Sequence, residues 1–343
     1  MIDTNRGGAK TMRRAGLLCV MFAAAVAAQQ GPYKVLKSVK VGGEGGFDYV
    51  YADEAGRRLY IPRTGATPRI TVFDLDTLEP VGEIKDANAR GAAVDPKSNH
   101  GFVSSKPVVM WDAKTLASIK TIDVEGRPDG ILFDPFNERV YIFSHSAPNA
   151  TVIDAKDGSV VGTIDLGGAP EQAVTDGKGR LFVDLEDKDN IAVVDAKTMA
   201  VTAHYDLGGK GGGCAGLALD VKNHVLFAAC RKPQAMVMLN ADDGKIITSL
   251  PIGSGSDGAG FNPKTMEAFS SQGDGTLTVV KENSPTSFVV EQNVTTMPSA
   301  KTMTLDGKTN RILLIAAEFG QPAAGARRGA MTPDSFSILV VGK

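Results

Sequence analysis

The sequence predicts an all-β fold: a seven-bladed β-propeller whose N-terminal strand closes the last blade. Three observations lead to this prediction. Similar segments recur along the chain at a period of about 40 to 45 residues. Each repeat holds four short apolar runs that alternate with period 2 and are bounded by Gly, Asp or Pro. The two ends of the chain each hold part of one repeat. The composition agrees, because 39 glycines suit a protein with many tight turns.

The clearest repeat runs from Gly126 to Leu166. It contains four predicted strands, at Gly130–Phe133, Val140–Ser144, Thr151–Ile153 and Val160–Leu166. Asp134 and Pro135 stand at the first two positions of the turn between the first two strands, where a type I turn favours them. In the turn after the third strand, Asp154 can cap backbone N–H groups and Gly158 can adopt a positive φ.

Two markers of this repeat recur along the chain. The second-strand marker appears seven times, beginning at Arg58, His100, Arg139, Arg180, Val225, Glu267 and Arg311. The third-strand marker begins at Val72, Met110, Val152, Val193, Met238 and Val279, in steps of 38, 42, 41, 45 and 41 residues. A parallel β-helix is the main alternative fold, but its coils are shorter than these units. Seven copies therefore predict seven blades.

The two ends of the chain predict how the ring closes. The last repeat has strands at Thr302–Leu305, Arg311–Ala316 and Phe336–Val341, and it stops without a fourth. Tyr33–Val41 reads as a strand of the fourth-strand type with no blade before it. Pairing this strand with the last blade leaves no open sheet edge, and open edges invite aggregation.

Residues 1–28 read as a signal peptide that is cleaved on export. Arg13 and Arg14 precede the apolar run Leu17–Ala28, whose end fits a small-x-small cleavage pattern. A short N-terminal helix is the alternative. We therefore expect one propeller domain over 33–343, in the periplasm or secreted, and monomeric. No apolar run reaches the roughly 20 residues of a membrane-spanning helix.

Cleavage would remove a net charge of +3 and leave a chain near −5. An acidic chain is a poor ligand for nucleic-acid phosphates, and no basic stripe carries interleaved aromatic residues. We therefore expect no nucleic-acid partner.

The pattern Gly-x-Pro-x-Gly, Asp-Pro, Arg-Val-Tyr-Ile, Val-Ile-Asp and Gly-x-Val-Val-x-Thr-Ile, within Gly126–Gly168, resembles the repeat of YncE-like, or YVTN-family, β-propellers. The resemblance covers about residues 33–343 and is weakest in the sixth copy. It implies an exported propeller of bacterial or archaeal type. Some members resemble single-stranded DNA binders and others surface-layer proteins. The motif is structural, so the resemblance carries over no catalytic residue.

Polar residues end the second strand of every predicted blade, and charged residues enter the first strands on the same face. The former are Arg63, Lys106, His145, Glu186, Arg231, Gln272 and Glu318, and the latter include Asp48, Arg90, Arg127, Asp129, Glu171, Asp257 and Lys301. From them we select nine candidate ligand-binding residues: Arg63, Arg90, Arg127, Asp129, His145, Glu171, Glu186, Arg231 and Glu318. The alternative is that these loop ends are merely solvated.

The last repeat holds an extra segment, residues 319–335, rich in Gly, Ala and Pro. Such a composition predicts a mobile loop on the same face, where Arg327 and Arg328 would reach over the channel toward an anionic ligand. An insertion without a role is the alternative.

The sequence holds no catalytic motif of the serine-hydrolase, zinc-protease or phosphate-loop kind, and no two histidines have metal-ligand spacing. We therefore expect no metal and no cofactor. Cys214 and Cys230 flank one hairpin, and the sequence leaves open whether they form a disulfide.

The functional prediction is a binding protein for a small molecule, peptide or protein, using its channel-mouth face. The alternatives are a metal-assisted lactone hydrolase or lyase that uses the same face, and a structural or adhesive module. A cluster of carboxylates alone would favour the enzyme, whereas a ring of mixed sign would favour binding.

Overall fold

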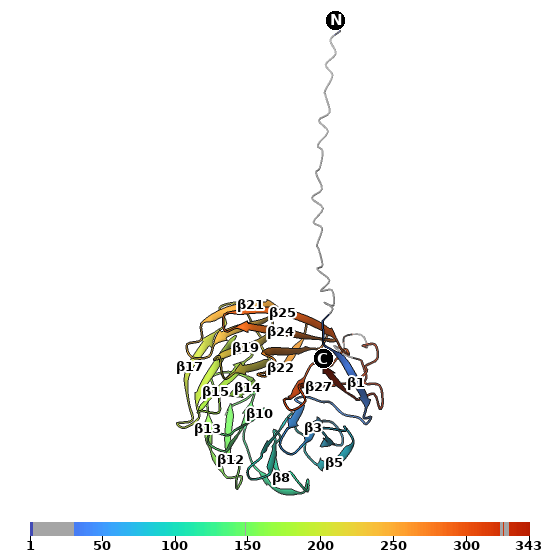
Figure 1. Ribbon diagram of the computed structural model, residues 1–343, viewed down its shortest axis with the longest axis vertical. Coiled ribbons are helices and arrows are strands. Elements are labelled where there is room, and N and C mark those ends of the chain that lie inside the picture. Colours follow the sequence, from blue (N-terminus) through green and yellow to red (C-terminus); the bar gives the residue numbers. More distant parts are fainter. Residues whose placement is uncertain (3–30, 148, 323–324, 326–328) are drawn as a thin grey trace.

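The computed structural model describes residues 1–2, 31–147, 149–322, 325 and 329–343. The predicted signal peptide lies outside the described residues except for its first two. The described residues form 28 strands, arranged in seven four-stranded antiparallel sheets around a ring (Figure 1). The predicted blade count is confirmed. No helix among these ranges is long and apolar enough to cross a membrane.

Each of the first four blades follows the chain from its inner strand to its outer strand. Blade 1 is β2 (Tyr51–Asp53), β3 (Arg58–Arg63), β4 (Arg69–Asp74) and β5 (Pro80–Lys85). Blade 2 is β6 (Ala92–Asp95), β7 (His100–Val103), β8 (Val108–Asp112) and β9 (Ser118–Ile122). Blade 3 is β10 (Pro128–Asp134), β11 (Arg139–Ser144), β12 (Ala150–Asp154) and β13 (Val160–Ile164). Blade 4 is β14 (Pro170–Thr175), β15 (Arg180–Leu185), β16 (Asn190–Asp195) and β17 (Ala200–Asp206).

The last three blades complete the ring. Blade 5 is β18 (Gly216–Asp220), β19 (Val225–Arg231), β20 (Gln234–Asn240) and β21 (Ile246–Pro251). Blade 6 is β22 (Ser256–Asn262), β23 (Glu267–Gln272), β24 (Thr276–Ser284) and β25 (Ser287–Thr295). Blade 7 is β26 (Met303–Asp306), β27 (Arg311–Ala316), β28 (Ser337–Gly342) and, from the other end of the chain, β1 (Lys34–Lys40).

The ring closes as the sequence predicts. β1 runs antiparallel to β28, with Lys34 opposite Gly342 and Lys40 opposite Ser337. In Figure 1 the blue β1 therefore lies beside the red end of the chain. Tyr33 fixes the start of this strand, because the Gln292 side chain accepts a hydrogen bond from Tyr33 N at 2.9 Å and donates one to Tyr33 O at 2.8 Å.

The apolar cores lie between neighbouring blades rather than inside one blade. One such core joins Phe336 and Ile338 of the last blade to Leu59 and Ile61 of the first. Trp111 in β8 and Tyr141 in β11 are both fully buried. Each blade thus uses the face of its neighbour to bury apolar residues, and the ring leaves no blade face uncovered.

Candidate functional site

A polar residue stands at the end of the first strand in every blade. Five residues before it lies a position that carries a charge in six of the seven blades. These polar residues, which end the first strand or in blade 4 directly follow it, are Asp53, Asp95, Asp134, Asp176, Asp220, Asn262 and Asp306. The corresponding positions hold Asp48, Arg90, Asp129, Glu171, Ala215, Asp257 and Lys301. Because the first strand of each blade borders the central channel, these residues meet around the channel mouth. We call the six charged residues, with Arg231 of blade 5, the mouth ring.

Ion pairs link the mouth ring from blade to blade. Arg90 Nη1 lies 2.8 Å from Asp48 Oδ2, and Arg90 Nε lies 3.7 Å from Asp129 Oδ1. Lys301 pairs with Asp257 and lies 3.6 Å from Asp48 Oδ1. These contacts hold both cations and all three carboxylates in place without a ligand.

Blade 5 has Ala215 at the ring position and supplies its charge from another strand. Arg231, at the end of β19, pairs with Asp257 and lies 3.0 Å from Glu186 Oε2. Its Nε also donates to Ser256 O at 2.9 Å. Around the ring the charges therefore alternate in sign, except where Asp129 and Glu171 stand next to each other.

His145 lies between these two adjacent carboxylates. Its Nε2 is buried, 3.1 Å from Asp129 Oδ2 and 3.7 Å from Glu171 Oε1. The contact with Asp129 raises the pKa of His145, against the opposing effect of burial. Burial acts to raise the pKa of Asp129, but the contacts with His145 and Arg90 outweigh it and lower that pKa.

Glu171 is the least compensated carboxylate of the ring. Burial raises its pKa to about 8, although the Tyr49 hydroxyl donates to Glu171 Oε2 at 2.6 Å. The neighbouring carboxylates of Asp257, Asp129 and Glu186 act in the same direction as burial. Tyr49 belongs to blade 1 and Glu171 to blade 4, so this hydrogen bond crosses the channel.

A cavity of about 280 Å³ opens below the mouth ring. Its polar lining includes Tyr49, Glu171, Gln172, Asp257 and Thr302, and inner strands of blades 1, 2, 3, 4, 6 and 7 form its walls. Blade 5 does not line it, because β18 packs against β22. Gln172 fastens that contact, since its side chain accepts from Leu217 N and Ala259 N and donates to Ala259 O.

The structure brings six of the predicted ligand-binding residues together: Arg90, Asp129, His145, Glu171, Glu186 and Arg231. Arg127 is exposed and lies beside them, with its Nη2 3.5 Å from His145 Nδ1. Glu318 is also exposed, and among the described residues no ion pair links its side chain to the ring. Arg327 and Arg328 lie outside the described residues.

Arg63 does not face solvent at the mouth. Only 1% of the residue is exposed, and its guanidinium lies 3.4 Å from the centroid of the Phe336 ring. It donates to Gly42 O at 2.8 Å and to Glu44 O at 3.3 Å. Arg63 thus attaches the segment after β1 to blade 1 and packs against the last blade.

The ends of the 319–335 segment pair with each other. Phe319 forms an antiparallel bridge with Met331, and both pack against the core between blades 7 and 1. The base of this segment is therefore packed on the core through the apolar side chains of Phe319 and Met331.

The sequence analysis missed Tyr49 and left Asp48, Asp257 and Lys301 out of the ligand set. The last three could have been found by aligning the seven repeats on their strand-ending residue, since they share one position with Arg90, Asp129 and Glu171. No local signal marks Tyr49, because its partner Glu171 is 122 residues away.

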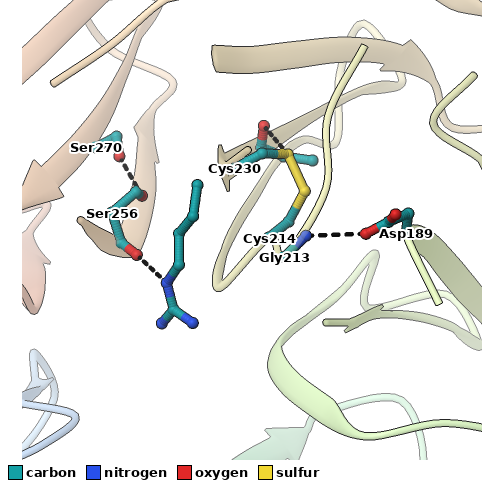
Figure 2. Close-up of a disulfide and its surroundings, with 8 residues drawn as sticks. Asp189, Gly213, Cys214, Cys230, Ser256 and Ser270 are labelled. Carbon is teal, nitrogen blue, oxygen red and sulfur yellow. Dashed lines mark hydrogen bonds between the residues drawn. A yellow bond between two sulfur atoms is a disulfide. The ribbon is translucent and has the colours of Figure 1, made fainter. Parts of the chain in front are cut away.

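Cys214 and Cys230 are joined by a disulfide, with Cα atoms 3.7 Å apart (Figure 2). The register of β18 and β19 pairs Gly216 with Ala229, one step from the register that would place the two cysteines directly opposite each other. Gly213 N donates to Asp189 Oδ1 at 3.0 Å, which ties this segment to blade 4. The bond therefore fixes the entry to blade 5, next to Ala215 and Arg231.

Comparison with solved structures supports the fold. A chain in a structure described as "Crystal Structure of Mitotic Checkpoint Complex" superposes with a TM-score of 0.71 over 97% of this chain and 99% of that chain. The two are 10% identical, so the likeness concerns the fold alone. No family model and no curated protein matches the sequence.

Proposed function

We propose that this chain is an exported, YncE-like β-propeller that binds a small polar ligand at its channel mouth. The observation that carries the proposal is the mouth ring: charged side chains from all but one of the equivalent repeat positions, held by mutual ion pairs above a cavity. A site whose side chains are already ordered binds without a large loss of conformational entropy.

The size and charge of the mouth indicate the class of ligand. A volume of about 280 Å³ lies at the lower limit of ligand pockets, which span roughly 300 to 1,000 Å³. Arginine, lysine and carboxylate groups of the ring offer partners to both signs of charge. We infer that the ligand is a small polar molecule with charged groups, or the charged end of a peptide.

The alternation of sign also bears on the alternative function. A metal-assisted lactone hydrolase or lyase would be favoured by carboxylates clustered without cations. Arg90, Arg231 and Lys301 separate most of the ring carboxylates, so the ring favours binding over catalysis.

Export is supported by the basic and apolar leader and by the disulfide. Disulfides persist in the periplasm and outside the cell, and they are rare in a reducing cytoplasm. The leader, the repeat pattern and the disulfide thus agree on an oxidising compartment.

The test begins with the full chain expressed in a bacterium and purified from the periplasmic fraction. We expect a cleaved protein that begins after Ala27 or Ala28. It is incubated in EDTA with a mixture of small metabolites, separated by gel filtration, and its retained compounds are identified by mass spectrometry. We expect wild type to retain a small polar compound that Asp257→Asn loses.

Asp243→Asn is the matched control, because Asp243 pairs with Lys245 in an exposed turn away from the ring. It should retain the same compound as wild type. The proposal of binding at the mouth is contradicted if wild type retains no compound. It is also contradicted if Asp257→Asn retains as much compound as wild type and has an unchanged melting temperature. Uncleaved protein in the cytoplasm would contradict export alone.

A further inference from the structure

The break in the alternation of the mouth ring suggests a second kind of occupant. Between blades 3 and 4, Asp129 and Glu171 are neighbours, and His145 lies between them. We propose that Asp129, His145 and Glu171 bind a divalent transition-metal ion of the Zn²⁺ type. This inference deepens the proposed function, on which it rests for the mouth as the binding site. It departs from the sequence-based expectation of no metal.

The geometry of the three ligand atoms supports the site. His145 Nε2, one Asp129 oxygen and one Glu171 oxygen all lie within 4.8 Å of one another. Bonds of about 2.0 to 2.2 Å to Zn²⁺ place neighbouring ligand atoms about 3 to 3.5 Å apart. The separations of 3.1 Å to Asp129 and 3.7 Å to Glu171 are close to those values. Small side-chain rotations would therefore complete the site.

The contact between His145 and Asp129 does not satisfy the nitrogen. Nε2 is buried and forms no well-directed hydrogen bond, although Asp129 Oδ2 is 3.1 Å away. A buried polar atom without a well-directed hydrogen bond costs free energy. A shared cation would satisfy the nitrogen and both carboxylates at once.

Neighbouring residues hold the two carboxylates in the required orientation. Tyr49 donates to Glu171 Oε2 and leaves Oε1 toward His145. Arg90 approaches Asp129 Oδ1 and leaves Oδ2 toward His145. Replacing residues that hydrogen-bond to metal ligands commonly weakens metal binding by about 10- to 100-fold.

Charge supports a divalent ion. The mouth ring and Glu186 together hold five carboxylates, at 48, 129, 171, 186 and 257, and three permanent cations, at 90, 231 and 301. Their formal sum is −2 when all five carboxylates are ionised, as they would be with a cation bound. In the part of the chain that the structure describes, His145 is the one basic side chain within ion-pair distance of Glu171. A divalent ion at this point would balance the surplus.

The donor set favours a transition metal over Ca²⁺ or Mg²⁺. Imidazole nitrogen suits Zn²⁺, Cu²⁺ and Ni²⁺, whereas Ca²⁺ and Mg²⁺ take oxygen ligands. Three protein ligands leave at least one position of a four-coordinate ion open. Because Glu171 lines the cavity, a ligand in the cavity would lie close to the bound ion.

Arg127 makes a distinguishing prediction. A metal on Nε2 requires the proton of the neutral ring on Nδ1, and Arg127 Nη2 lies 3.5 Å from Nδ1. Two hydrogen-bond donors, Arg127 Nη2 and the protonated Nδ1 of His145, then face each other. Arg127→Gln should therefore bind Zn²⁺ at least as tightly as wild type, and weaker binding would contradict Nε2 as the ligand.

The test is isothermal titration calorimetry of ZnCl₂ into the mature protein after dialysis against EDTA. We expect one Zn²⁺ site in wild type, at least tenfold weaker binding in His145→Gln and Glu171→Gln, and about tenfold weaker binding in Tyr49→Phe. His224→Gln is the matched control. His224 also contacts a carboxylate, Asp242 at 2.7 Å, but is exposed and away from the mouth, so this variant should bind as wild type does.

Two further measurements keep the result unambiguous. The melting temperature of each metal-free variant shows whether it is folded, and Co²⁺ provides a visible spectrum that reports nitrogen and oxygen ligands. The proposal is overturned if folded His145→Gln binds Zn²⁺ as wild type does, or if Ca²⁺ binds as tightly as Zn²⁺. Since the metabolite assay is performed in EDTA, a wild-type protein that retains the metabolite but does not bind Zn²⁺ would refute the metal site alone.

Discussion

At Gly216 the lack of a side chain lets the inner strand of blade 5 approach that of blade 6. A Cβ at this position would lie 2.7 Å from the carbonyl carbon of Gly258 and 2.9 Å from Ala259 N. Both contacts are with backbone, which cannot rotate away. The glycine is therefore required by space, and the approach it allows takes blade 5 off the wall of the cavity.

Gly216→Ala should destabilise the protein by about 1 to 3 kcal/mol, the usual cost of overpacking a rigid site. Gly273→Ala is the control, because a Cβ there would meet its nearest neighbour at 3.6 Å, an ordinary contact. Both variants are compared by urea denaturation. Equal stability of the two variants would show that β18 and β22 can separate without cost.

Residues also show where sequence reasoning reached its limit. The charged position of the repeat is visible once seven copies are aligned, so most of the mouth ring could be predicted. Arg63 ends β3, and His145 and Glu186 directly follow the second strands of their blades. Arg63 is nevertheless buried against Phe336, which lies 273 positions later in the chain. Such pairings between distant residues leave no mark on the local pattern.

At the scale of elements, the turns opposite the mouth are clasped between blades as well. Arg57, in the turn between β2 and β3, donates to Asp76 of blade 1 at 2.7 Å and to Asp306 of blade 7 at 2.8 Å. Burial would raise the pKa of Asp306, but Arg57 and Thr309 outweigh burial and lower it to about 2. This clasp lies across the seam where the first and last blades meet.

The clasp predicts a specific loss of stability in acid. The pKa of Asp306 is lowered in the folded state, so its contribution is complete above the unfolded pKa of about 4 and is lost as the pH falls toward about 2. We expect a contribution on the order of 1 kcal/mol, because solvent screens the pair. Asp306→Asn should lower stability at neutral pH and flatten its dependence on pH between about 4 and 2.

Urea denaturation at a series of pH values measures this effect. Asp243→Asn is the control: its pair with Lys245 also lowers the pKa of Asp243, but solvent screens this exposed pair, so the variant should change the pH dependence less than Asp306→Asn does. If the stability of Asp306→Asn falls as steeply with decreasing pH as that of wild type, other carboxylates are responsible for the loss of stability in acid.

For the whole molecule, the sequence predicted blade number, blade order and closure, with strand boundaries within two residues in the clearest repeat. These features follow from the spacing of apolar residues and from the turn residues, and both are present within each single repeat. The approach of β18 to β22, the hydrogen bond of Tyr49 across the channel and the position of His145 between two carboxylates could not be predicted. They depend on how blades sit against one another, which no single repeat encodes.

Closure makes a prediction about cooperativity. Without residues 33–41, β28 becomes an open edge and the core that Tyr33 shares with Phe269 and Leu339 is exposed. Each blade buries its apolar face against the next, so opening one seam should weaken every blade in turn. A chain that begins at residue 42 should therefore exchange its amide hydrogens faster in blade 4, on the far side of the ring, as well as in blade 7.

Hydrogen exchange read by mass spectrometry measures the two blades separately. A chain that begins at Gly31 is the control, since it keeps β1 and both hydrogen bonds from Gln292 to Tyr33. It should match the cleaved full-length protein in every blade. Faster exchange in blade 7 with an unchanged blade 4 would mean that the blades unfold independently, as stacked repeats do in an open array. In that case β1 would protect one sheet edge without coupling the ring.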